Sequence, residues 1–571
     1  MLPNAPIDDD TGLPIPTIAV ATAGGLSVIT DNGRVWDMWP TYAGAIESQE
    51  IYFTKSNKIA FTHGSNWVYY YPIPYRDTSS TYWNGLDYFI GRFTDTERDW
   101  ATNGIPINVG ANGITNFLED RAIGHTNGVD IIDINEGGLL GSGMHCGIAT
   151  DFNTGWQHGN IKRALLASTD DTDISADTLG STNTIDGTFS TSDGWTANSD
   201  WTIASNKATC DGTNSGRFLY PSTDRWDIGT SVAVEVTVTD YTGGNLYVSY
   251  STGGAASGTA MGSDNGGVPF KFVGEVTGNT LIYLRSESFV GSIDNVKIYP
   301  AEADRSVFNT GLAVVGTIAK TPVATGAELV SYDSLTSSNY LEQQYNSDLN
   351  FGTDDFCMMG WCYNVGNNSS ILYRLHNSTT VGVGYIVATS SGGELGYSSY
   401  TQGFRSAGRI THYTSDTWNG KENWNMFVCG KKDGNGFMYV NGVLKQTSAN
   451  ANSHTDTTYN PPLRIGNDYA GTGTIGGGKL ALIRISSGFP SEEQIKKIYE
   501  DEKKLFASNA KCTLYGSSDA VVALAYDDTN NVIHAGTSAG RSDFRGLNRI
   551  NNTTTAVTTA ISASNGLVAE Q

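Results

Sequence analysis

Aromatic side chains are the residues of this sequence best suited to binding a ligand through ring stacking. An indole or phenol ring can stack on the apolar face of a sugar ring. The candidate glycan contacts are Trp195, Trp201, Trp226, Trp361, Tyr397 and Tyr400. Tryptophans also fill the cores of small β-domains. A structural role therefore stands beside the glycan-binding role for each of them.

Oxygen-bearing side chains in expected loops form a second candidate site. Ca²⁺ prefers hard oxygen ligands, which Asp354, Asp355, Asn467 and Asp468 could supply. The same residue types also make ordinary turns, so both interpretations stay open. Calcium is the only cofactor that the sequence suggests. The six cysteines show no CxxC spacing and are expected as buried free thiols.

No set of residues has the spacing of a catalytic site. The eight histidines are scattered, and no nucleophile elbow, zinc-protease, phosphate-loop or dinucleotide motif occurs. Neighbouring carboxylates such as Asp527 and Asp528 are expected on solvated turns. A glycosidase needs two facing carboxyl groups roughly 5–9 Å apart, a distance that a sequence does not give. We expect a protein that is not an enzyme, with a glycan depolymerase as the less favoured alternative.

The composition indicates which elements must position these side chains. The chain has 67 glycines among 571 residues, 11% aromatic residues and only 16% charged residues, against a usual charged share of about 25%. This predicts an all-β fold with many turns and excludes helical bundles and coiled coils. The net charge of −23 disfavours nucleic-acid partners. We expect no membrane span and no secretory signal, because no apolar window is long enough and the first residues lack the signal pattern.

Short hairpins recur near both ends of the chain. Each combines an apolar strand, a polar turn that usually holds glycine, and a second apolar strand. The copies lie at residues 18–29, 59–70, 121–132 and 533–544. Repeated hairpins are typical of propeller blades, although four unrelated hairpins would give the same pattern. We predict one propeller-like domain, at residues 1–172 and 510–571, which is interrupted by a long insertion.

The insertion begins with a predicted β-module at residues 182–300. It opens on Asp186-Gly187-Thr188-Phe189, has alternating valines from Val232 to Val238, and closes on Ile293-Asp294-Asn295-Val296. This opening and closing resemble the galactose-binding-like jelly rolls found among carbohydrate-binding modules. The resemblance implies a jelly roll that can bind sugars.

A second module is predicted at residues 309–490, followed by a helix at 491–507. Its order of motifs is Asp355-Phe356 with Gly360-Trp361, then Trp424-Asn425, Tyr439-Val440-Asn441-Gly442 and Leu463-Arg464-Ile465-Gly466. This order resembles laminin-G/concanavalin A-like lectin domains, many of which bind glycans, some of them through calcium. In the helix, Ser491 and Gln494 form the pattern of a capping box.

The whole chain resembles structural proteins of tailed bacteriophages, particularly marine ones. The resemblance rests on the module order and on segments 151–162 and 515–521. It implies a virion tail protein, fibre or tail-associated, whose propeller is an assembly scaffold and whose sandwiches bind host glycans. The implied partners are other tail proteins, further copies of the chain in a homo-oligomer, and host surface polysaccharide. The alternative is a purely structural tail tube or nozzle component.

Overall fold

The computed structural model describes most of the chain from residue 7 to residue 571. The ranges outside this description are 14, 23–24, 40–50, 54–57, 64–66, 73–77, 80–87, 93–113, 119–121, 134–142, 176–185, 223–225, 228, 251–256, 262–269, 277–280, 307, 378–381, 401–408, 418–422, 449–460 and 469–470. The predicted start of the first inserted module, at residue 182, therefore lies outside the described residues. The described fold is nearly all β, as the composition predicts.

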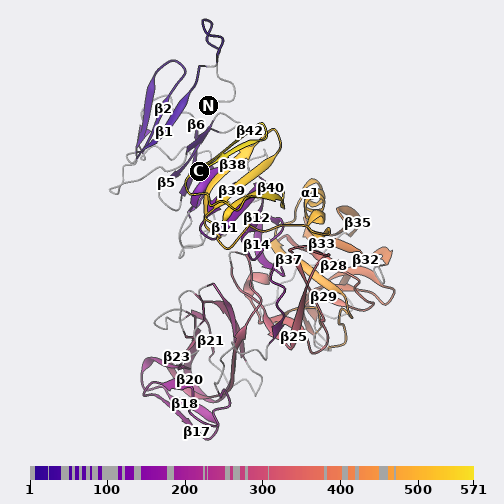
Figure 1. Cartoon of the computed structure of the whole chain (residues 1–571). Helices are drawn as coiled ribbons and strands as arrows, with labels where there is room; N and C mark the ends of the chain where they lie inside the picture. Colours follow the sequence, from indigo (N-terminus) through magenta and orange to yellow (C-terminus); the bar gives the residue numbers. More distant parts are fainter. Residues whose placement is uncertain are drawn as a thin grey trace. The chain divides into compact units, whose positions relative to one another are not determined.

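The chain divides into two compact units. The end unit contains residues 1–161, 322–329 and 490–571, and the inserted unit contains residues 162–321 and 330–489. Figure 1 colours the chain along its sequence, and the end unit accordingly combines indigo and purple strands with yellow ones. Distant parts of the sequence thus contribute to one unit.

The described part of the end unit consists of small sheets, which are antiparallel except that β7 pairs parallel with β3. The described sheets are β1 (Ile18–Thr22), β2 (Gly25–Ile29) and β3 (Val35–Trp39) with β7 (Thr78–Ser79); β4 (Ile51–Phe53), β5 (Lys58–His63), β6 (Trp67–Pro72) and β8 (Tyr88–Arg92); β9 (Ile114–Leu118), β10 (Ala122–His125), β11 (Gly128–Asp133), β12 (Met144–Ile148) and β13 (Gln157–His158); β38 (Val521–Asp527), β39 (Val532–Thr537), β40 (Gly540–Arg545) and β41 (Asn548–Asn552); and β42 (Ile561–Ser564) with β43 (Leu567–Glu570). All four predicted hairpins form antiparallel strand pairs. The arrangement of these sheets as a propeller stays a prediction.

Two of the hairpins each contain a glycine whose missing side chain lets another segment pack closely. A Cβ atom on Gly124 of β10 would lie 2.6 Å from Cγ1 of Val521 in β38. A Cβ atom on Gly536 of β39 would lie 2.7 Å from Cγ1 of Val557. Both glycines stand four residues before a turn glycine with positive φ, Gly128 or Gly540. The sequence repeat therefore corresponds to a repeated packing position in the structure.

The first module of the inserted unit is built around two long strands. Its strands are β16 (Trp195–Ala197), β17 (Trp201–Ala204), β18 (Lys207–Asp211), β19 (Ser215–Pro221), β20 (Ser231–Ser249), β21 (Ser257–Met261), β22 (Phe270–Glu275) and β23 (Tyr283–Pro300). Strands β20 and β23 pair antiparallel along most of their length, with bulges that bend them. The alternating valines Val232, Val234, Val236 and Val238 are all buried in the core of this module.

The second module of the inserted unit is a sandwich of two sheets. One sheet contains β15 (Ile174–Ser175), β25 (Thr317–Pro322), β26 (Val330–Asp333), β37 (Lys479–Ser487), β28 (Phe356–Tyr363), β33 (Trp424–Lys432), β34 (Asn435–Val440) and β35 (Val443–Ser448), with β14 (Asn160–Leu165) beside β37. The other contains β24 (Ala313–Val315), β27 (Tyr340–Gln343), β36 (Leu463–Ile465), β29 (Ser370–Asn377), β30 (Gly382–Thr389), β31 (Glu394–Tyr400) and β32 (Arg409–Thr417). Strand β28 is buried on both faces and pairs with β33 and β37, as its unbroken apolar sequence predicts.

One α-helix occurs in the described part of the chain. Helix α1 (Glu492–Glu502) begins with the predicted capping box between Ser491 and Gln494 and continues into a 3₁₀ turn, Lys503–Phe506. No described helix combines the length and the apolar character that crossing a membrane requires. All six cysteines are buried and free, as predicted.

Candidate functional site

The four candidate tryptophans lie in the cores of their modules. Trp195, Trp201, Trp226 and Trp361 are each less than 9% exposed. The Trp195 indole N–H donates to the carbonyl of Asp186 at 3.0 Å, and the Trp201 ring stacks on Phe289 at 6.2 Å. These positions match the structural alternative, because a buried indole offers no open face to a sugar. A glycan-binding role for these tryptophans stays a prediction.

The two candidate tyrosines lie in β31 of the lectin-like sandwich. Tyr397 pairs with Val387 on one side and with His412 on the other, and Tyr400 pairs with Gly384 and Arg409. The backbone of β31 is therefore in the interior of its sheet. The side chains of both tyrosines lie outside the described part of the structure.

The four candidate calcium ligands fall into two separate pairs. Asp354 and Asp355 precede β28, where Oδ1 of Asp355 accepts from the N–H of Asp433 at 2.9 Å. Asp468 lies in the loop after β36, and Gly473 of this loop accepts from the N–H of Ser370, beyond the other end of β28. Eight strand residues span about 26 Å. The structure therefore does not bring the two pairs together.

Asp468 is engaged in local turn chemistry, whereas Asn467 and Asp355 contact residues distant in the sequence. The carboxylate of Asp468 accepts from the N–H of Thr472 at 2.9 Å and from its hydroxyl at 3.0 Å. The side chain of Asn467 is buried and donates to the carbonyl of Ser337 at 3.4 Å. Among the described residues, no group of three His, Cys, Asp or Glu residues could hold a metal ion. Calcium binding stays a prediction.

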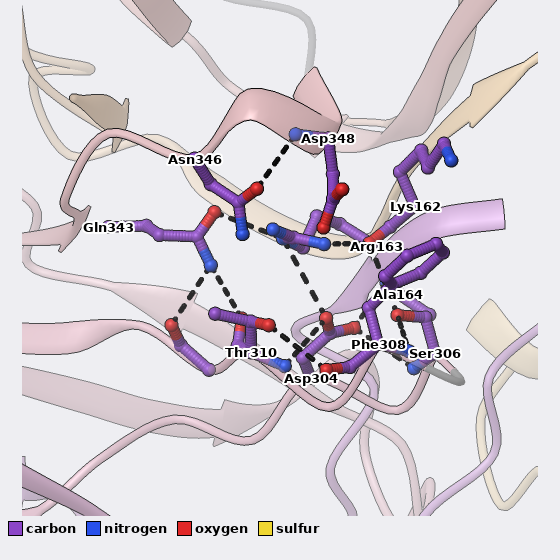
Figure 2. A network of polar contacts seen from close by, with 11 residues as sticks. Lys162, Arg163, Ala164, Asp304, Ser306, Phe308, Thr310, Gln343, Asn346 and Asp348 are labelled. Atoms are coloured by element: carbon purple, nitrogen blue, oxygen red, sulfur yellow. Dashed lines mark hydrogen bonds and ion pairs between the residues drawn. The ribbon is translucent and has the colours of Figure 1, made fainter. Parts of the chain in front are cut away.

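A buried cluster of charged residues lies in the lectin-like sandwich (Figure 2). Its centre is Arg163 of β14, which is fully buried. Nε of Arg163 donates to Oε1 of Gln343 at 3.0 Å and lies 3.7 Å from Oδ2 of Asp304. Nη1 of Arg163 donates to the carbonyl of Lys162. We use the name arginine cluster for the following residues: Lys162, Arg163, Asp304, Gln343 and Arg374, with the bordering Phe308, Tyr345, Asn346, Asp348 and Asn350.

Asp304 is the acidic partner at the base of the arginine cluster. Its carboxylate accepts from the backbone N–H groups of Ala164 and Ser306, both at 2.9 Å, and of Thr310 at 3.1 Å. Burial raises the pKa of Asp304, and the charge of Arg163 opposes this rise. Burial likewise lowers the pKa of the Arg163 guanidinium. Through these three hydrogen bonds, Asp304 fixes the chain segment that connects the two modules.

Arg374 of β29 is the second buried guanidinium of the arginine cluster. Its Nη2 donates to Oδ1 of Asn350 at 2.6 Å and to the carbonyl of Asn346 at 3.4 Å. The guanidinium carbon lies 5.8 Å from the ring centre of Tyr345 and 5.7 Å from that of Tyr385. The cation is therefore held by neutral oxygens and aromatic rings.

Both arginines keep a buried N–H without a hydrogen-bond partner. These are Nη2 of Arg163 and Nε of Arg374. Partly exposed residues border the cluster: Lys162, Phe308, Tyr345, Asn346, Asp348 and Asn350. The ammonium of Lys162 lies 4.5 Å from the ring centre of Phe308. The arginine cluster thus combines a cationic floor with an aromatic and amide border.

A second charged group in the inserted unit is fully paired by contrast. Glu342 accepts from Nε of Arg464 at 2.7 Å and lies 3.5 Å from the ammonium of Lys271. Lys271 also lies 3.5 Å from Glu235, which accepts from the hydroxyl of Tyr299 at 2.8 Å. This chain of contacts links the jelly-roll module to the lectin-like sandwich, and we assign it a structural role.

Residues 150–156 make hydrogen bonds to residues 501–519 within the end unit. The N–H of Thr150 donates to Oδ1 of Asp519 at 2.8 Å, and Nδ2 of Asn153 donates to the carbonyl of Cys512 at 2.7 Å. The indole N–H of Trp156 donates to Oδ2 of Asp501 in α1 at 3.1 Å. These segments hold the end unit together across a long stretch of sequence.

A buried imidazole–carboxylate pair also occurs in the end unit. Nδ1 of His534 lies 2.7 Å from Oδ1 of Asp543, which also accepts from Nε of Arg541 at 2.7 Å. Burial opposes ionisation of Asp543, yet the hydrogen bonds from His534 and Arg541 leave its pKa lowered overall. Arg541 further pairs with Glu570 of β43 at 2.7 Å. The network joins β39, β40 and β43. Its hydrogen bonds and ion pairs compensate for the burial of these polar groups.

No sequence motif marks Arg163 or Arg374. The one signal in the sequence is that each arginine adjoins an apolar run. Arg163 precedes Ala164–Leu166, and Arg374 follows Ile371-Leu372-Tyr373. A charged residue in such a run is either at the exposed face of a strand or buried with partners. Periodicity alone does not distinguish these cases.

Comparison with known proteins identifies the fold of the second inserted module. Residues 336–496 match the family model of the concanavalin A-like lectin/glucanases superfamily. This confirms the laminin-G/concanavalin A-like lectin fold expected from the motif order. No curated protein matches the chain.

Solved structures of toxin binding domains are also similar to this chain. They include the binding domain of Paraclostridial Mosquitocidal Protein 1 (15% identity, 42% of this chain, 62% of that chain, TM-score 0.29) and the botulinum neurotoxin serotype D/C binding domain (16%, 44%, 60%, 0.28). A third is the binding domain of botulinum neurotoxin DC, solved in complex with rat synaptotagmin II (14%, 43%, 59%, 0.28). The chain spans about three fifths of the length of these structures.

Proposed function

We propose that this chain is a non-enzymatic tail protein of a bacteriophage whose inserted lectin-like sandwich binds host surface glycans. The observation that carries the proposal is the match of residues 336–496 to the concanavalin A-like lectin superfamily. Those residues form a two-sheet sandwich with a continuous buried core. A lectin fold inserted in the sequence of another unit is suited to presenting a binding surface from a scaffold.

The end unit is the proposed assembly scaffold. Its sheets repeat one packing position, at Gly124 and Gly536, and its central segments join residues more than 300 positions apart in the sequence. The resemblance of segments 151–162 and 515–521 to tail proteins supports a place in the virion tail. The proposed partners are further copies of the chain and other tail proteins.

A glycan depolymerase is the competing function, because the matched superfamily includes glucanases. Two acidic residues of the inserted unit, Asp304 and Glu342, already have partners, which supports a binding role instead. Asp304 accepts three backbone N–H groups, and Glu342 is paired with Arg464 and Lys271. Carboxyl groups with such partners are ill suited to exchange protons with a substrate.

Polysaccharide retention tests the proposed function. The purified full chain is passed over immobilised surface polysaccharide from the host cells, and eluted polysaccharide is assayed for new reducing ends. We expect retention without release of reducing ends. Release of reducing ends would establish the depolymerase, and absence of retention would favour the purely structural tail component.

A further inference from the structure

We infer that the first module of the inserted unit carries a second glycan-binding site on the outer face of its sheet, formed by Phe218, Tyr220, Tyr247 and Tyr283. We call these four residues the aromatic strip. The ligand class is a neutral pyranose oligosaccharide. The inference goes beyond the proposed function, which places glycan binding in the lectin-like sandwich at residues 336–496.

Strand pairing places the four rings on one face of three neighbouring strands, β19, β23 and β20, of which Figure 1 labels β20 and β23. Phe218 of β19 lies opposite Arg285 of β23, and Arg285 lies opposite Tyr247 of β20. Residues directly opposite each other in an antiparallel sheet share a face, as do residues two positions apart in one strand. The ring centre of Tyr283 accordingly lies 5.4 Å from that of Phe218 and 4.9 Å from that of Tyr220.

The opposite face of the same strands is the core of the module. Its residues Leu219, Leu246, Val248 and Leu284 are all buried, whereas the four members of the aromatic strip are partly exposed. A sheet with one face on the core usually alternates apolar residues inside with polar residues outside. The aromatic strip departs from this alternation and leaves apolar surface at the solvent, which is typical of a binding site. Aromatic residues also favour strands in general, a cause that the experiment below separates from binding.

The rings of the aromatic strip keep groups available for a ligand. The ring of Tyr283 is inclined by 65° to Phe218 and by 52° to Tyr220, so neither neighbour lies flat on it. The hydroxyls of Tyr220, Tyr247 and Tyr283 make no hydrogen bond within the described part of the chain. A partly exposed phenol can stack on the apolar face of a sugar ring and form hydrogen bonds with its hydroxyl groups.

Buried tyrosines of the inserted unit show the contrasting arrangement. The hydroxyl of Tyr299 donates to Oε1 of Glu235 at 2.8 Å, and that of Tyr332 donates to Oε1 of Glu302 at 2.5 Å. These phenols are engaged inside the protein. The tyrosines of the aromatic strip instead present their polar ends to solvent.

The charge at this face favours a neutral ligand. The charged side chains on the outer face of β23 beside the strip, Arg285 and Glu287, form an ion pair with each other. Arg217, at the start of β19, lies 3.7 Å from Oδ1 of Asp200. The face therefore has no excess positive charge, and the net charge of −23 on the whole chain repels anionic sugars.

The size of the aromatic strip favours an oligosaccharide over a second copy of the chain. A whole aromatic side chain has about 150–250 Å² of surface, and these four are only partly exposed. Together they offer well under the roughly 800 Å² that each partner contributes to a standard protein interface. Because neighbouring strands lie about 4.8 Å apart, the strip extends about 10 Å across the sheet, which suits a few sugar rings.

Calorimetric titration of the full chain with cellohexaose, mannohexaose and hexagalacturonate tests the inference. We expect at least one of the two neutral oligosaccharides to bind, and hexagalacturonate to bind about tenfold more weakly or not at all. Tyr283→Ala removes the central ring and should weaken binding about tenfold or more. Tyr283→Phe keeps the ring and should stay within about threefold of the parent chain.

Tyr526→Ala is the matched control for the loss of a partly exposed tyrosine. Tyr526 lies in β38 of the end unit, where its hydroxyl donates to Oδ1 of Asn531 at 2.6 Å, and the variant should bind as the parent chain does. Thermal unfolding shows whether each variant is folded. If Tyr283→Ala is not, Tyr247→Ala replaces it with the same expected loss, because no ring contact involves Tyr247 within the described residues.

Three results would overturn the inference. The first is that neither neutral oligosaccharide binds the parent chain, and the second is unchanged binding by a folded Tyr283→Ala variant. The third is hexagalacturonate binding as tight as that of the neutral oligosaccharides. If the parent chain binds no oligosaccharide but self-associates in sedimentation velocity, and Tyr283→Ala does not, the face is a contact between copies instead.

Host polysaccharide retention separates the inference from the proposed function. Retention of host polysaccharide by Tyr283→Ala at the parent level would leave the lectin-like sandwich as a binding site, whatever the oligosaccharide titrations give. A parent chain that binds a neutral oligosaccharide through Tyr283 but does not retain host polysaccharide would uphold the inference and contradict the proposed function.

Discussion

The backbone N–H of Trp156 donates to Oε1 of Glu502 at 2.8 Å, which joins the segment 151–162 to the end of helix α1. Glu502 is completely buried at this contact. The indole of Trp156 reaches Asp501 on the same helix. The helix that follows the insertion is thus fixed to a segment that precedes it.

Glu502→Ala should destabilise the end unit. The substitution leaves the buried N–H of Trp156 without its acceptor, which costs about 1–3 kcal/mol. The matched control is Glu500→Ala on the same helix, because Glu500 is exposed and pairs only with Lys503 at the surface, a type of pair worth about 0–1 kcal/mol. Urea unfolding followed by tryptophan fluorescence measures both. Equal stability of the two variants would contradict the assigned role of Glu502.

Gly124→Ala should also destabilise the end unit. The added Cβ would lie 2.6 Å from Cγ1 of Val521, a distance that forces the Val521 side chain or its strand to shift, and overpacking of this kind costs about 1–3 kcal/mol. Gly243→Ala is the control, since nothing lies within 4 Å of a Cβ at that position. The thermal midpoint should fall for Gly124→Ala and stay close to that of the parent for Gly243→Ala. A parent-like midpoint for Gly124→Ala would refute the packing role of this glycine.

Trp361→Ala should impair folding before it impairs any binding. Trp361 is almost fully buried in β28, and removal of a buried tryptophan side chain costs about 3–5 kcal/mol. Near-ultraviolet circular dichroism and thermal unfolding of the variant measure the effect. A variant that keeps the parent stability and loses polysaccharide retention would show that this indole contacts the glycan instead.

Stability of the inserted unit should fall as the pH rises above the usual range of a glutamate pKa. Burial raises the pKa of Glu302, whose carboxyl accepts from the hydroxyl of Tyr332. Because the folded state holds this proton to a higher pH than the unfolded state, the stabilisation is complete below about pH 4.3, the usual pKa of glutamate. It is lost as the pH rises through the higher pKa of the folded state. Lys320 and Arg305 oppose the shift, and Asp170 adds to it.

Glu302→Gln isolates this effect. The amide cannot ionise, so urea midpoints measured between pH 4 and pH 8 should decline less for the variant than for the parent chain. The remaining slope belongs to other groups, including Asp304, whose pKa burial also raises. An unchanged slope in Glu302→Gln would show that the carboxyl of Glu302 titrates alike in both states.

Much of the fold could be predicted because its signals are local. The glycine-containing turns at 18–29 and 533–544 specify hairpins, the alternating valines Val232–Val238 specify a strand, and Ser491 with Gln494 specifies a helix start. The predicted hairpins, capping box and lectin fold are confirmed. These features depend on residues close together in the sequence.

The candidate site was harder to predict because it depends on residues far apart in the sequence. The arginine cluster joins residue 163 to residues 304, 343 and 374, and no periodicity encodes such a meeting. The tryptophans were chosen by residue type, and an indole serves a core as well as a sugar site. The two pairs of candidate calcium ligands lie at opposite ends of β28. This separation follows from the pairing of β28 with β37, which the sequence alone does not give.

Immunolabelling of purified phage particles tests both the proposed place in the virion and the proposed glycan-binding role. An antibody against residues 180–500 is imaged on the particles by electron microscopy. We predict label on the distal tail, where the inserted sandwiches can reach the host surface. Label confined to the collar or the tube would contradict the binding role, and particles without label would contradict the assignment to the virion.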